Sequence, residues 1–303
     1  MKSLVIGYGS IGKRHTRLLK ELDCLPAVVS EREVDFPRAF SDLAVAVAEH
    51  RPDFVIIANR THQHYDTLTG LAAAGFSGRV LVEKPLFERC RPIQAGDFLS
   101  VSVAYNLRFH PVIRRLREIA AEETILSVQA YVGQYLPNWR PRVDYRQSYS
   151  ASAKQGGGAL RDLSHELDYL AWLFGPWNRV TALGGHISPL EIDSDDIYVL
   201  LMQTERCPVV TVQMSYLDRV ACRRLIINTT RRTIEADLVS ATLAIDGRAE
   251  TYPVEQDFTY REMHRALIND DATALCSIEE GLATLRLIEA AEQANLLKQW
   301  ITK

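Results

Sequence analysis

The sequence predicts an N-terminal doubly wound parallel α/β sheet of the Rossmann type, followed by an α+β domain with a mostly antiparallel open sheet. Three observations predict this: a length of 303 residues, a change in the rhythm of strands and helices near residue 125, and a glycine-rich turn after the first strand. At roughly 150 residues per domain, this length predicts two domains that each bury a core. We place them at residues 1–110 and 111–303, and the terminal helix is free to pack back on the first domain.

The first domain alternates short β-branched strands with helical segments. Such alternation builds βαβ units, whose right-handed crossovers place helices on both faces of a parallel sheet. The predicted strands are Leu4–Gly7, Ala27–Ser30, Phe54–Ala58, Val80–Glu83 and Val101–Tyr105.

From about residue 125, strands follow one another with few helices between them, which is typical of an open antiparallel sheet. Leucines at three- and four-residue spacing predict one helix from Ala159 to Phe174. A second apolar stripe predicts a helix from about Glu279 to Trp300. The predicted strands are Leu126–Val132, Val180–Gly184, Ile197–Gln203, Val209–Tyr216, Arg223–Asn228 and Thr233–Ala236.

Composition excludes several classes of function. Hydrophobic residues make up 47% of the chain and charged residues 24%, as in a folded globular protein. The 35 basic and 38 acidic side chains give a net charge of −3, which provides no general field for nucleic acid. The five cysteines form no C-x-x-C pair, and no signal peptide or membrane-spanning run is present. We therefore expect a cytoplasmic protein without a metal, a nucleic-acid partner or a membrane partner.

A G-x-G-x-x-G pattern at Gly7, Gly9 and Gly12 follows the first strand and opens a helix, which is the context of a dinucleotide-binding turn. Gly7 permits the tight turn, Gly9 lets a pyrophosphate approach the backbone, and Gly12 brings helix against strand. The first helical residues, Ser10 and Ile11, face the phosphate charge.

The end of the second strand decides which dinucleotide binds. There, Glu31 can accept hydrogen bonds from the ribose diol of NAD, whereas Ser30 with Arg32 can bind the additional phosphate of NADP. Both cofactors remain open, and these residues favour NAD slightly.

Four ordered motifs resemble the glucose-fructose oxidoreductase/inositol dehydrogenase (Gfo/Idh/MocA) family. The segment Val82-Glu83-Lys84-Pro85-Leu86 is similar to the family's E-K-P motif at the end of a Rossmann strand. Residues 59–64 resemble its T-P-T-x-x-H loop, residues 105–111 its Y-N-x-R-F-x-P segment, and residues 156–162 its glycine-led helix. The resemblance implies a nicotinamide-dependent oxidoreductase that acts on a sugar, a cyclitol or a related derivative. It also implies a homo-oligomer formed through the C-terminal sheet.

In the family, the E-K-P lysine reaches the reacting oxygen, a helix histidine exchanges the proton, and an aspartate orients the imidazole. The resemblance assigns these catalytic and substrate-contacting roles to Lys84, His165 and Asp162. The helix departs from the family's D-x-G-x-H pattern, because His165 follows Asp162 by three residues and Ser164 replaces the glycine. Residues three apart still share a helix face, so the pairing stays open, with Asp168 as the alternative orienting carboxylate.

Polar residues just past the carboxyl ends of the strands lie where a parallel sheet places its ligand crevice. His64 is explained equally well as a helix-start residue with no ligand contact. Besides the glycine turn, the predicted cofactor-binding residues are Glu31, Arg32, Asn59, Thr61, His64, Glu83, Lys84 and Asn106.

Aromatic and guanidinium side chains, including Trp139, Arg140 and Arg142, gather between residues 134 and 146. This mixture suits stacking on a ring and binding an anion. We predict that Trp139 and Arg140, with the nearby Tyr149, bind an anionic substrate such as a nucleotide-linked or acidic sugar. A solvated or subunit-interface loop explains the same residues equally well.

Two other functions stay open. One is a redox-neutral enzyme that retains NAD(H) and recycles the hydride, and the other is a non-catalytic module that senses NAD(H). Hydride transfer requires a group that takes the hydroxyl proton. The joint presence of Lys84, Asp162 and His165 favours catalysis over sensing, because a sensor needs none of them.

Overall fold

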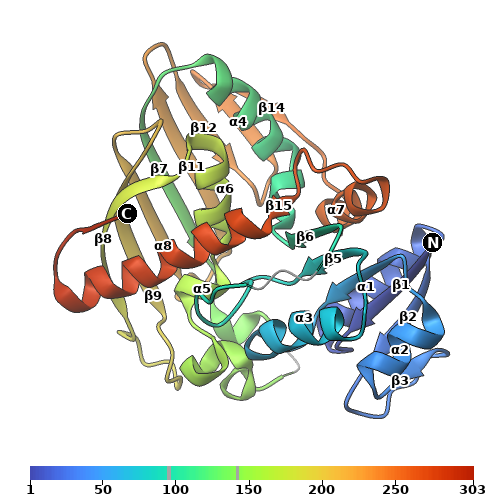
Figure 1. Ribbon diagram of the computed structural model, residues 1–303. Helices are drawn as coiled ribbons and strands as arrows, with labels where there is room; N and C mark the ends of the chain where they lie inside the picture. The colour runs from blue at the N-terminus through green and yellow to red at the C-terminus, as the bar shows by residue number, and fades with distance from the viewer. Residues whose placement is uncertain (94–96, 141–142) are drawn as a thin grey trace. The chain divides into compact units, whose positions relative to one another are not determined.

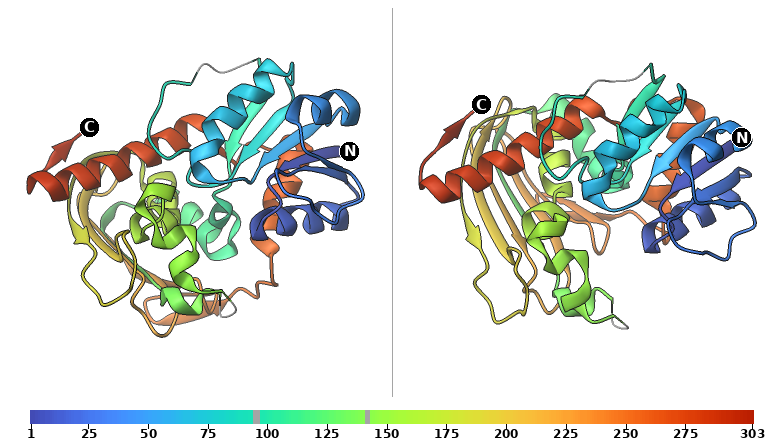
Figure 2. Two further views of the ribbon diagram at one scale, coloured as in Figure 1. Left: turned by 90° about the horizontal axis from the view of Figure 1, so that it is seen from below. Right: turned by 60° about the horizontal axis from the view of Figure 1, so that its bottom comes forward.

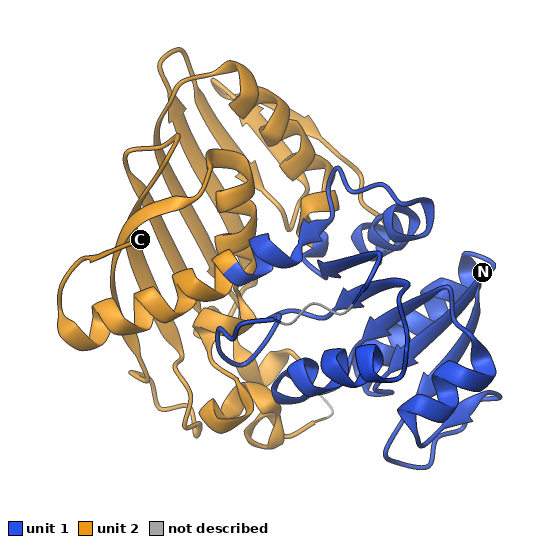
Figure 3. Ribbon diagram, in the orientation of Figure 1, with its two compact units in different colours: residues 1–106, 257–282 blue, residues 107–256, 283–303 orange. Residues whose placement is uncertain are grey.

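The computed structural model describes residues 1–93, 97–140 and 143–303. The chain forms two compact units (Figure 3). Unit 1 contains Met1–Asn106 and Asp257–Leu282, and unit 2 contains Leu107–Gln256 and Ala283–Lys303. Unit 1 is therefore completed by a segment from near the end of the chain.

Unit 1 is built on a seven-stranded sheet with the order β15-β6-β5-β4-β1-β2-β3. All neighbouring strands are parallel except β15, which pairs antiparallel with β6. The order reverses between β1 and β4, which is where such sheets bind ligands. This confirms the predicted doubly wound parallel sheet. Its strands are β1 (Lys2–Ile6), β2 (Leu25–Val29), β3 (Ala39–Phe40), β4 (Phe54–Ile57), β5 (Arg79–Val82), β6 (Ser100–Val103) and β15 (Cys276–Ser277).

Helices cover this sheet because its central strands are apolar on both faces, and every residue of β4 is buried. Helix α1 packs against α7, whereas α2 packs against α3. The connection from β5 to β6 has no helix within residues 83–93 and 97–99. The helices are α1 (Ser10–Glu21), α2 (Leu43–His50), α3 (His64–Ala73) and α7 (Phe258–Asn269), and a 3-10 turn, η1 (Thr61–Gln63), precedes α3.

Unit 2 contains a nine-stranded sheet with the order β14-β13-β12-β11-β7-β10-β9-β8-β16. Only β7 and β10 pair in parallel, and the other neighbours are antiparallel. This confirms the predicted mostly antiparallel sheet. The strands are β7 (Ile125–Gly133), β8 (Trp177–Gly185), β9 (Ile197–Thr204), β10 (Val210–Ser215), β11 (Cys222–Thr229), β12 (Thr233–Asp237), β13 (Thr242–Ile245), β14 (Arg248–Thr251) and β16 (Ile301–Thr302).

One face of this sheet forms the core of unit 2. Figures 1 and 2 show α6 and the C-terminal part of α8 along the same face. Along β9 the side chains alternate: Leu200 and Met202 are buried, whereas Val199 and Leu201 are exposed on the other face. The helices are α4 (Pro111–Glu122), α5 (Ala159–Asp162), α6 (His165–Phe174) and α8 (Ile278–Leu297), of which α8 begins in unit 1.

Two predicted helices differ in extent from the observed ones. The predicted helix 159–174 is divided into α5 and α6, because Ser164 N donates to the carbonyl of Arg161, three residues back, and tightens the turn. The terminal helix ends at Leu297, since Lys298 has a positive φ of 55° and the chain then enters β16.

Within the described ranges, every helix is too short or too polar to cross a membrane. The same residues contain no group of three or more His, Cys, Asp or Glu side chains that could hold a metal ion.

Candidate functional site

The glycine turn of unit 1 has the backbone geometry that its sequence pattern requires. Gly7 adopts a φ of +96°, which favours glycine, and its N–H donates to the carbonyl of Val29 at 2.9 Å. A Cβ on Gly12 would lie 2.0 Å from the Gly7 carbonyl oxygen, so α1 can approach β1 only without a side chain there. A Cβ on Gly9 would meet no protein atom within 4 Å. The space beside Gly9 is therefore open to a ligand.

The N-terminus of α1 is suited to a diphosphate. Its N-cap residue, Gly9, offers no side-chain hydrogen bond, and the first turn contains no acidic residue. Helix α2 provides the contrast, since the Asp42 carboxylate caps it by accepting from Val45 N at 2.9 Å. The free N–H groups of α1 and the open space beside Gly9 fit the pyrophosphate of a dinucleotide.

The residues predicted to select the ribose lie past the end of β2. Glu31 is exposed, and its Oε1 accepts a hydrogen bond from Gln63 Nε2 at 3.1 Å. The Ser30 hydroxyl closes a local turn: it donates to the Arg32 carbonyl at 2.9 Å and accepts from Arg32 N at 3.1 Å. Glu31 thus presents a carboxylate, whereas the Ser30 hydroxyl is engaged by the backbone.

The other predicted cofactor residues follow the parallel strands β4, β5 and β6, whose carboxyl ends share one sheet edge with the glycine turn after β1. Asn59 Nδ2 donates to Thr67 at 2.8 Å, and Asn106 Nδ2 donates to Thr259 of α7 at 2.6 Å. Thr61 begins η1. Unit 1 therefore collects the predicted dinucleotide residues at the edge where these sheets bind ligands.

Lys84 is half-buried within an otherwise buried segment formed by Glu83, Pro85 and Leu86. His64 supports this segment, because its Nδ1 lies 3.2 Å from the Pro85 carbonyl oxygen and 3.1 Å from that of Leu86. Burial lowers the pKa of His64, which favours a neutral ring. The structure thus places His64 against the backbone that follows Lys84.

In unit 2, Asp162 is buried among phenol groups. Tyr216 Oη donates to Asp162 Oδ2 at 2.6 Å, and Tyr149 is hydrogen-bonded to the same carboxylate. Burial, followed by the Asp162 charge, raises the pKa of both tyrosines, so each phenol keeps its proton and acts as a donor. Tyr216 lies just after β10, far from Asp162 in sequence, and the sequence analysis missed it.

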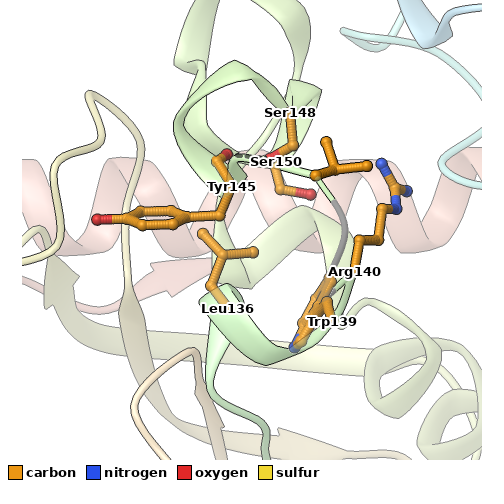
Figure 4. Close-up of a pocket in the computed structure, with 7 residues that line it drawn as sticks. Leu136, Trp139, Arg140, Tyr145, Ser148 and Ser150 are labelled. Carbon is orange, nitrogen blue, oxygen red and sulfur yellow. Dashed lines mark hydrogen bonds between the residues drawn. The ribbon is translucent and has the colours of Figure 1, made fainter.

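The aromatic and guanidinium segment meets these tyrosines. The Trp139 ring packs edge-on against Tyr216 at 5.1 Å, and the Arg140 guanidinium lies 5.7 Å from the Tyr149 ring centroid. Figure 4 shows the hollow of this region, with Trp139 and Arg140 on one wall. Arg142 lies outside the described residues. The hollow is lined by Leu136, Trp139, Arg140, Val143, Tyr145, Ser148 and Ser150.

The carboxylates beside His165 form buried ion pairs that the sequence analysis missed. Arg108 donates to both oxygens of Asp168, at 2.9 and 2.7 Å, and Arg223 Nε lies 2.8 Å from Glu166 Oε1. His165 itself is partly exposed at the first position of α6. No local pattern reveals these pairs, because Arg108 precedes α4 and Arg223 belongs to β11.

A search of the curated proteins finds similarity to an uncharacterized oxidoreductase of Synechocystis sp., 26% identical over 155 residues. This match spans 49% of the chain and 41% of the relative. The fold is similar to that of a levoglucosan dehydrogenase solved with NADH, with a TM-score of 0.85, 18% identity and coverage of 100% and 98%. It is also similar to that of the WlbA dehydrogenase of Bordetella pertussis solved with NADH and UDP-GlcNAcA, with a TM-score of 0.82, 20% identity and the same coverage.

Two family models match the chain and together span most of it. Residues 1–97 match the model described as an oxidoreductase family with an NAD-binding Rossmann fold. Residues 113–235 match the model of the GFO/IDH/MocA C-terminal domain. The first match confirms the predicted nicotinamide dinucleotide, in the form of NAD. With the glycine turn and both sheets in place, the chain belongs to the Gfo/Idh/MocA family of NAD-binding oxidoreductases.

Proposed function

We propose that the protein is a dehydrogenase or reductase that transfers a hydride between nicotinamide and a hydroxyl or carbonyl carbon of a sugar, cyclitol or nucleotide-sugar-like substrate. The observation that carries this proposal is the position of Lys84. It follows β5 at the sheet edge that bears the glycine turn, and it reaches solvent from a buried segment. An ammonium at this edge is available to a substrate oxygen beside the cofactor.

Unit 1 supplies the groups that hold the cofactor. We assign the diphosphate to the backbone of Ser10 and Ile11 beside Gly9, and the adenosine ribose to Glu31 with Arg32 next to it. When bound, the nicotinamide ring supplies the hydride acceptor or donor. The nicotinamide end is assigned to Asn59, Thr61, His64, Glu83, Lys84 and Asn106.

Two side chains handle the proton that accompanies hydride transfer. In the oxidation direction the substrate O–H must lose its proton as its carbon loses a hydride. We assign contact with the oxygen to Lys84 and acceptance of the proton to His165, with Asp162 as the orienting carboxylate. An imidazole titrates near neutral pH, so His165 can return the proton in the reverse reaction.

We assign the substrate ring to the side chains of Trp139, Arg140 and Tyr149. Trp139 offers an aromatic ring and Arg140 a guanidinium, which suits a ring that carries a carboxylate or phosphate. The similar WlbA dehydrogenase was solved with UDP-GlcNAcA, whereas the similar levoglucosan dehydrogenase was solved with the uncharged sugars levoglucosan and L-sorbose. The Arg140 guanidinium makes an anionic sugar or nucleotide sugar our first choice of substrate.

The test is NADH formation from NAD with a panel of neutral sugars, cyclitols, sugar acids and nucleotide sugars. Lys84→Ala should lower kcat/KM for the active substrate by about a hundredfold or more, as loss of general acid-base catalysis does. Lys298→Ala, which removes an exposed lysine of unit 2, is the matched control and should match wild type. Full activity of Lys84→Ala would refute the catalytic assignment.

Arg140→Ala tests the anion assignment separately. It should raise KM for an anionic substrate about tenfold while kcat changes little, because it removes binding shared by ground state and transition state. An unchanged KM would favour the solvated or subunit-interface loop.

We also propose that two copies associate through the outer face of the unit 2 sheet. Apolar side chains of neighbouring strands are exposed there. Leu183 pairs with Val199, and Leu201 lies two residue pairs further along β9. A contiguous apolar face of this kind is typical of a subunit interface. Leu201→Asp should convert the dimer to a monomer in light scattering, and a wild-type monomer would refute this proposal.

A further inference from the structure

Unit 1 contains a buried row of three polar side chains, of which only Glu83 has been assigned a role so far. Glu83 Oε1 lies 2.9 Å from His15 Nε2, and His15 Nδ1 lies 2.8 Å from His264 Nε2. Both histidines are fully buried, and Glu83 is 7% exposed. These residues come from the segment before Lys84, from α1 and from α7. We call Glu83, His15 and His264 the histidine bridge.

The hydrogen-bond chemistry gives the histidine bridge a direction. An ionised carboxylate only accepts, so Glu83 requires a proton on His15 Nε2. With a single ring proton, His15 accepts at Nδ1 and His264 donates its Nε2 proton. Burial lowers the pKa of His264, which keeps this ring neutral. Within the described residues, His264 Nδ1 has no hydrogen-bond partner, so His264 makes its one ring hydrogen bond to His15.

The same carboxylate fixes the backbone of Lys84. Glu83 Oε2 accepts from the Lys84 backbone N–H at 3.1 Å. On the following side, His64 holds the carbonyls of Pro85 and Leu86. Lys84 therefore projects from a backbone that buried side chains fix before and after it.

The histidine bridge also connects this segment to the dinucleotide helix. His15 lies three residues after Gly12, within α1, and its ring packs edge-on against Tyr260 of α7 at 5.7 Å. Asp257, at the start of α7, pairs with Arg14 and Arg17 of α1. The start of α7 is thus ion-paired to α1, the helix that follows the glycine turn. The paired residues Arg17 and Asp257 lie 240 positions apart in sequence.

We infer that Glu83, His15 and His264 are positioning residues that set the place of the Lys84 side chain relative to helix α1. This inference rests on the proposed role of Lys84 in proton handling. Hydrogen bonds are electrostatically stronger in a buried, low-dielectric site than in water, and a small misplacement of a reacting group is costly for rate. The family model of the NAD-binding fold ends at residue 97, before α7. Through the histidine bridge, α7 contributes His264 to the positioning of Lys84.

The central test compares His264→Leu, which removes the hydrogen bond to His15, with His264→Gln, whose side-chain amide can restore it. His264→Leu should lower kcat by about ten- to a hundredfold, while the dissociation constant for NADH, measured by fluorescence, stays within about twofold. His264→Gln should recover most of the loss. His50→Leu is the matched control, because His50 is a buried histidine of unit 1 that bonds to the Ser3 and Leu25 carbonyls instead.

Three results would overturn the inference: equal losses of kcat in His264→Leu and His50→Leu, no recovery in His264→Gln, or wild-type kcat in Glu83→Gln. The last variant cannot accept from His15 and from Lys84 N–H together, because an amide has only one acceptor oxygen. Each comparison distinguishes a misplaced Lys84 side chain from a general loss of stability of the protein.

Two measurements need no known substrate. They distinguish failure of this inference from failure of the proposed function. Ring ¹⁵N spectra of the wild-type protein should show a proton on His15 Nε2, and a bare Nε2 would overturn the inference. The rate at which acetic anhydride modifies Lys84, followed by peptide mass spectrometry, should change in His264→Leu and stay unchanged in His50→Leu. Equal rates in all three proteins would overturn it as well. Activity retained by Lys84→Ala would refute the proposed function alone.

Discussion

The two units build their candidate sites from different materials. In unit 1 the dinucleotide turn is formed by backbone atoms. Two glycines allow close approach, and the uncapped N-terminus of α1 presents N–H groups. In unit 2 the candidate site is made of side chains from segments far apart in the sequence, such as Asp162 with Tyr216 and Asp168 with Arg108. A site formed by backbone atoms is disrupted by almost any added side-chain atom. A site formed by side chains is disrupted when one of the partners is removed. The two units should therefore fail in different ways when mutated.

The largest effect is expected from Arg108→Met in unit 2. Arg108 and Asp168 are each 2% exposed at the side chain, and the guanidinium donates to both carboxylate oxygens. Removing one partner of a buried ion pair costs about 3–5 kcal/mol, because the other charge stays in the interior. Urea unfolding should show this loss. Arg115→Met is the control, since its exposed pair with Glu118 is worth less than about 1 kcal/mol.

If Arg108→Met and Arg115→Met unfold at the same urea concentration, the α6 carboxylates do not depend on their side-chain partners. The claim that unit 2 depends on each side-chain partner would then be refuted.

The glycine turn gives the next largest effect and separates fold from binding within unit 1. Gly12→Ala forces a Cβ against the Gly7 carbonyl and should destabilise the protein by about 1–3 kcal/mol. Gly9→Ala adds the same methyl group where no protein atom lies within 4 Å, so stability should stay near wild type. NADH binding should nevertheless weaken, because we assign the diphosphate to that space. Thermal unfolding and NADH fluorescence measure the two quantities, and strong NADH binding by Gly9→Ala would contradict the assignment.

The same contrast explains which features the sequence could predict. The glycine turn and the E-K-P segment could be predicted because a backbone site leaves a local pattern at fixed spacing. Most strands were found to within a few residues, since buried parallel strands are continuously apolar and the sheet of unit 2 alternates. The place of Lys84 at the ligand edge follows from strand order alone.

The partners of unit 2 and the histidine bridge could not be predicted, because they join residues with no sequence relation. Tyr216 reaches Asp162 across 54 positions, and His264 reaches His15 across 249. The division of the predicted helix 159–174 was missed for a related reason: leucine spacing continues through Ser164, and only the hydrogen bonds show the tightened turn.

The interior of unit 2 also predicts a pH effect at Asp195, which holds the start of α5 by accepting from Leu160 N at 2.9 Å. Burial raises the pKa of Asp195 from 3.8 to about 7. Between pH 3.8 and about pH 7, Asp195 keeps its proton in the folded protein and releases it in the unfolded chain. The free energy of unfolding therefore falls as pH rises, by up to about 1.4 kcal/mol per pH unit. Asp195→Asn should remove this slope and become more stable than wild type near pH 7.

Urea unfolding of both proteins from pH 4 to pH 8 measures the slope as a difference, which cancels the other titrating groups. Asp35→Asn, at an exposed carboxylate of unit 1, should give curves parallel to wild type. Parallel curves for Asp195→Asn as well would show that Asp195 keeps its charge in the folded protein.

The smallest expected effect compares the two helix N-termini of unit 1. Asp42 caps α2, whereas α1 has no side-chain cap, and we attribute this difference to the diphosphate that α1 binds. Asp42→Ala should lower stability by about 1 kcal/mol, the usual cost of losing an N-cap, and leave NADH affinity unchanged. Bound NADH should stabilise Asp42→Ala and wild type equally in thermal unfolding, because none of the residues assigned to the cofactor belongs to α2. A smaller NADH-induced stabilisation of Asp42→Ala would mean that α2 shares in binding the cofactor, and the α1 N-terminus would then not be the distinctive anion site of unit 1.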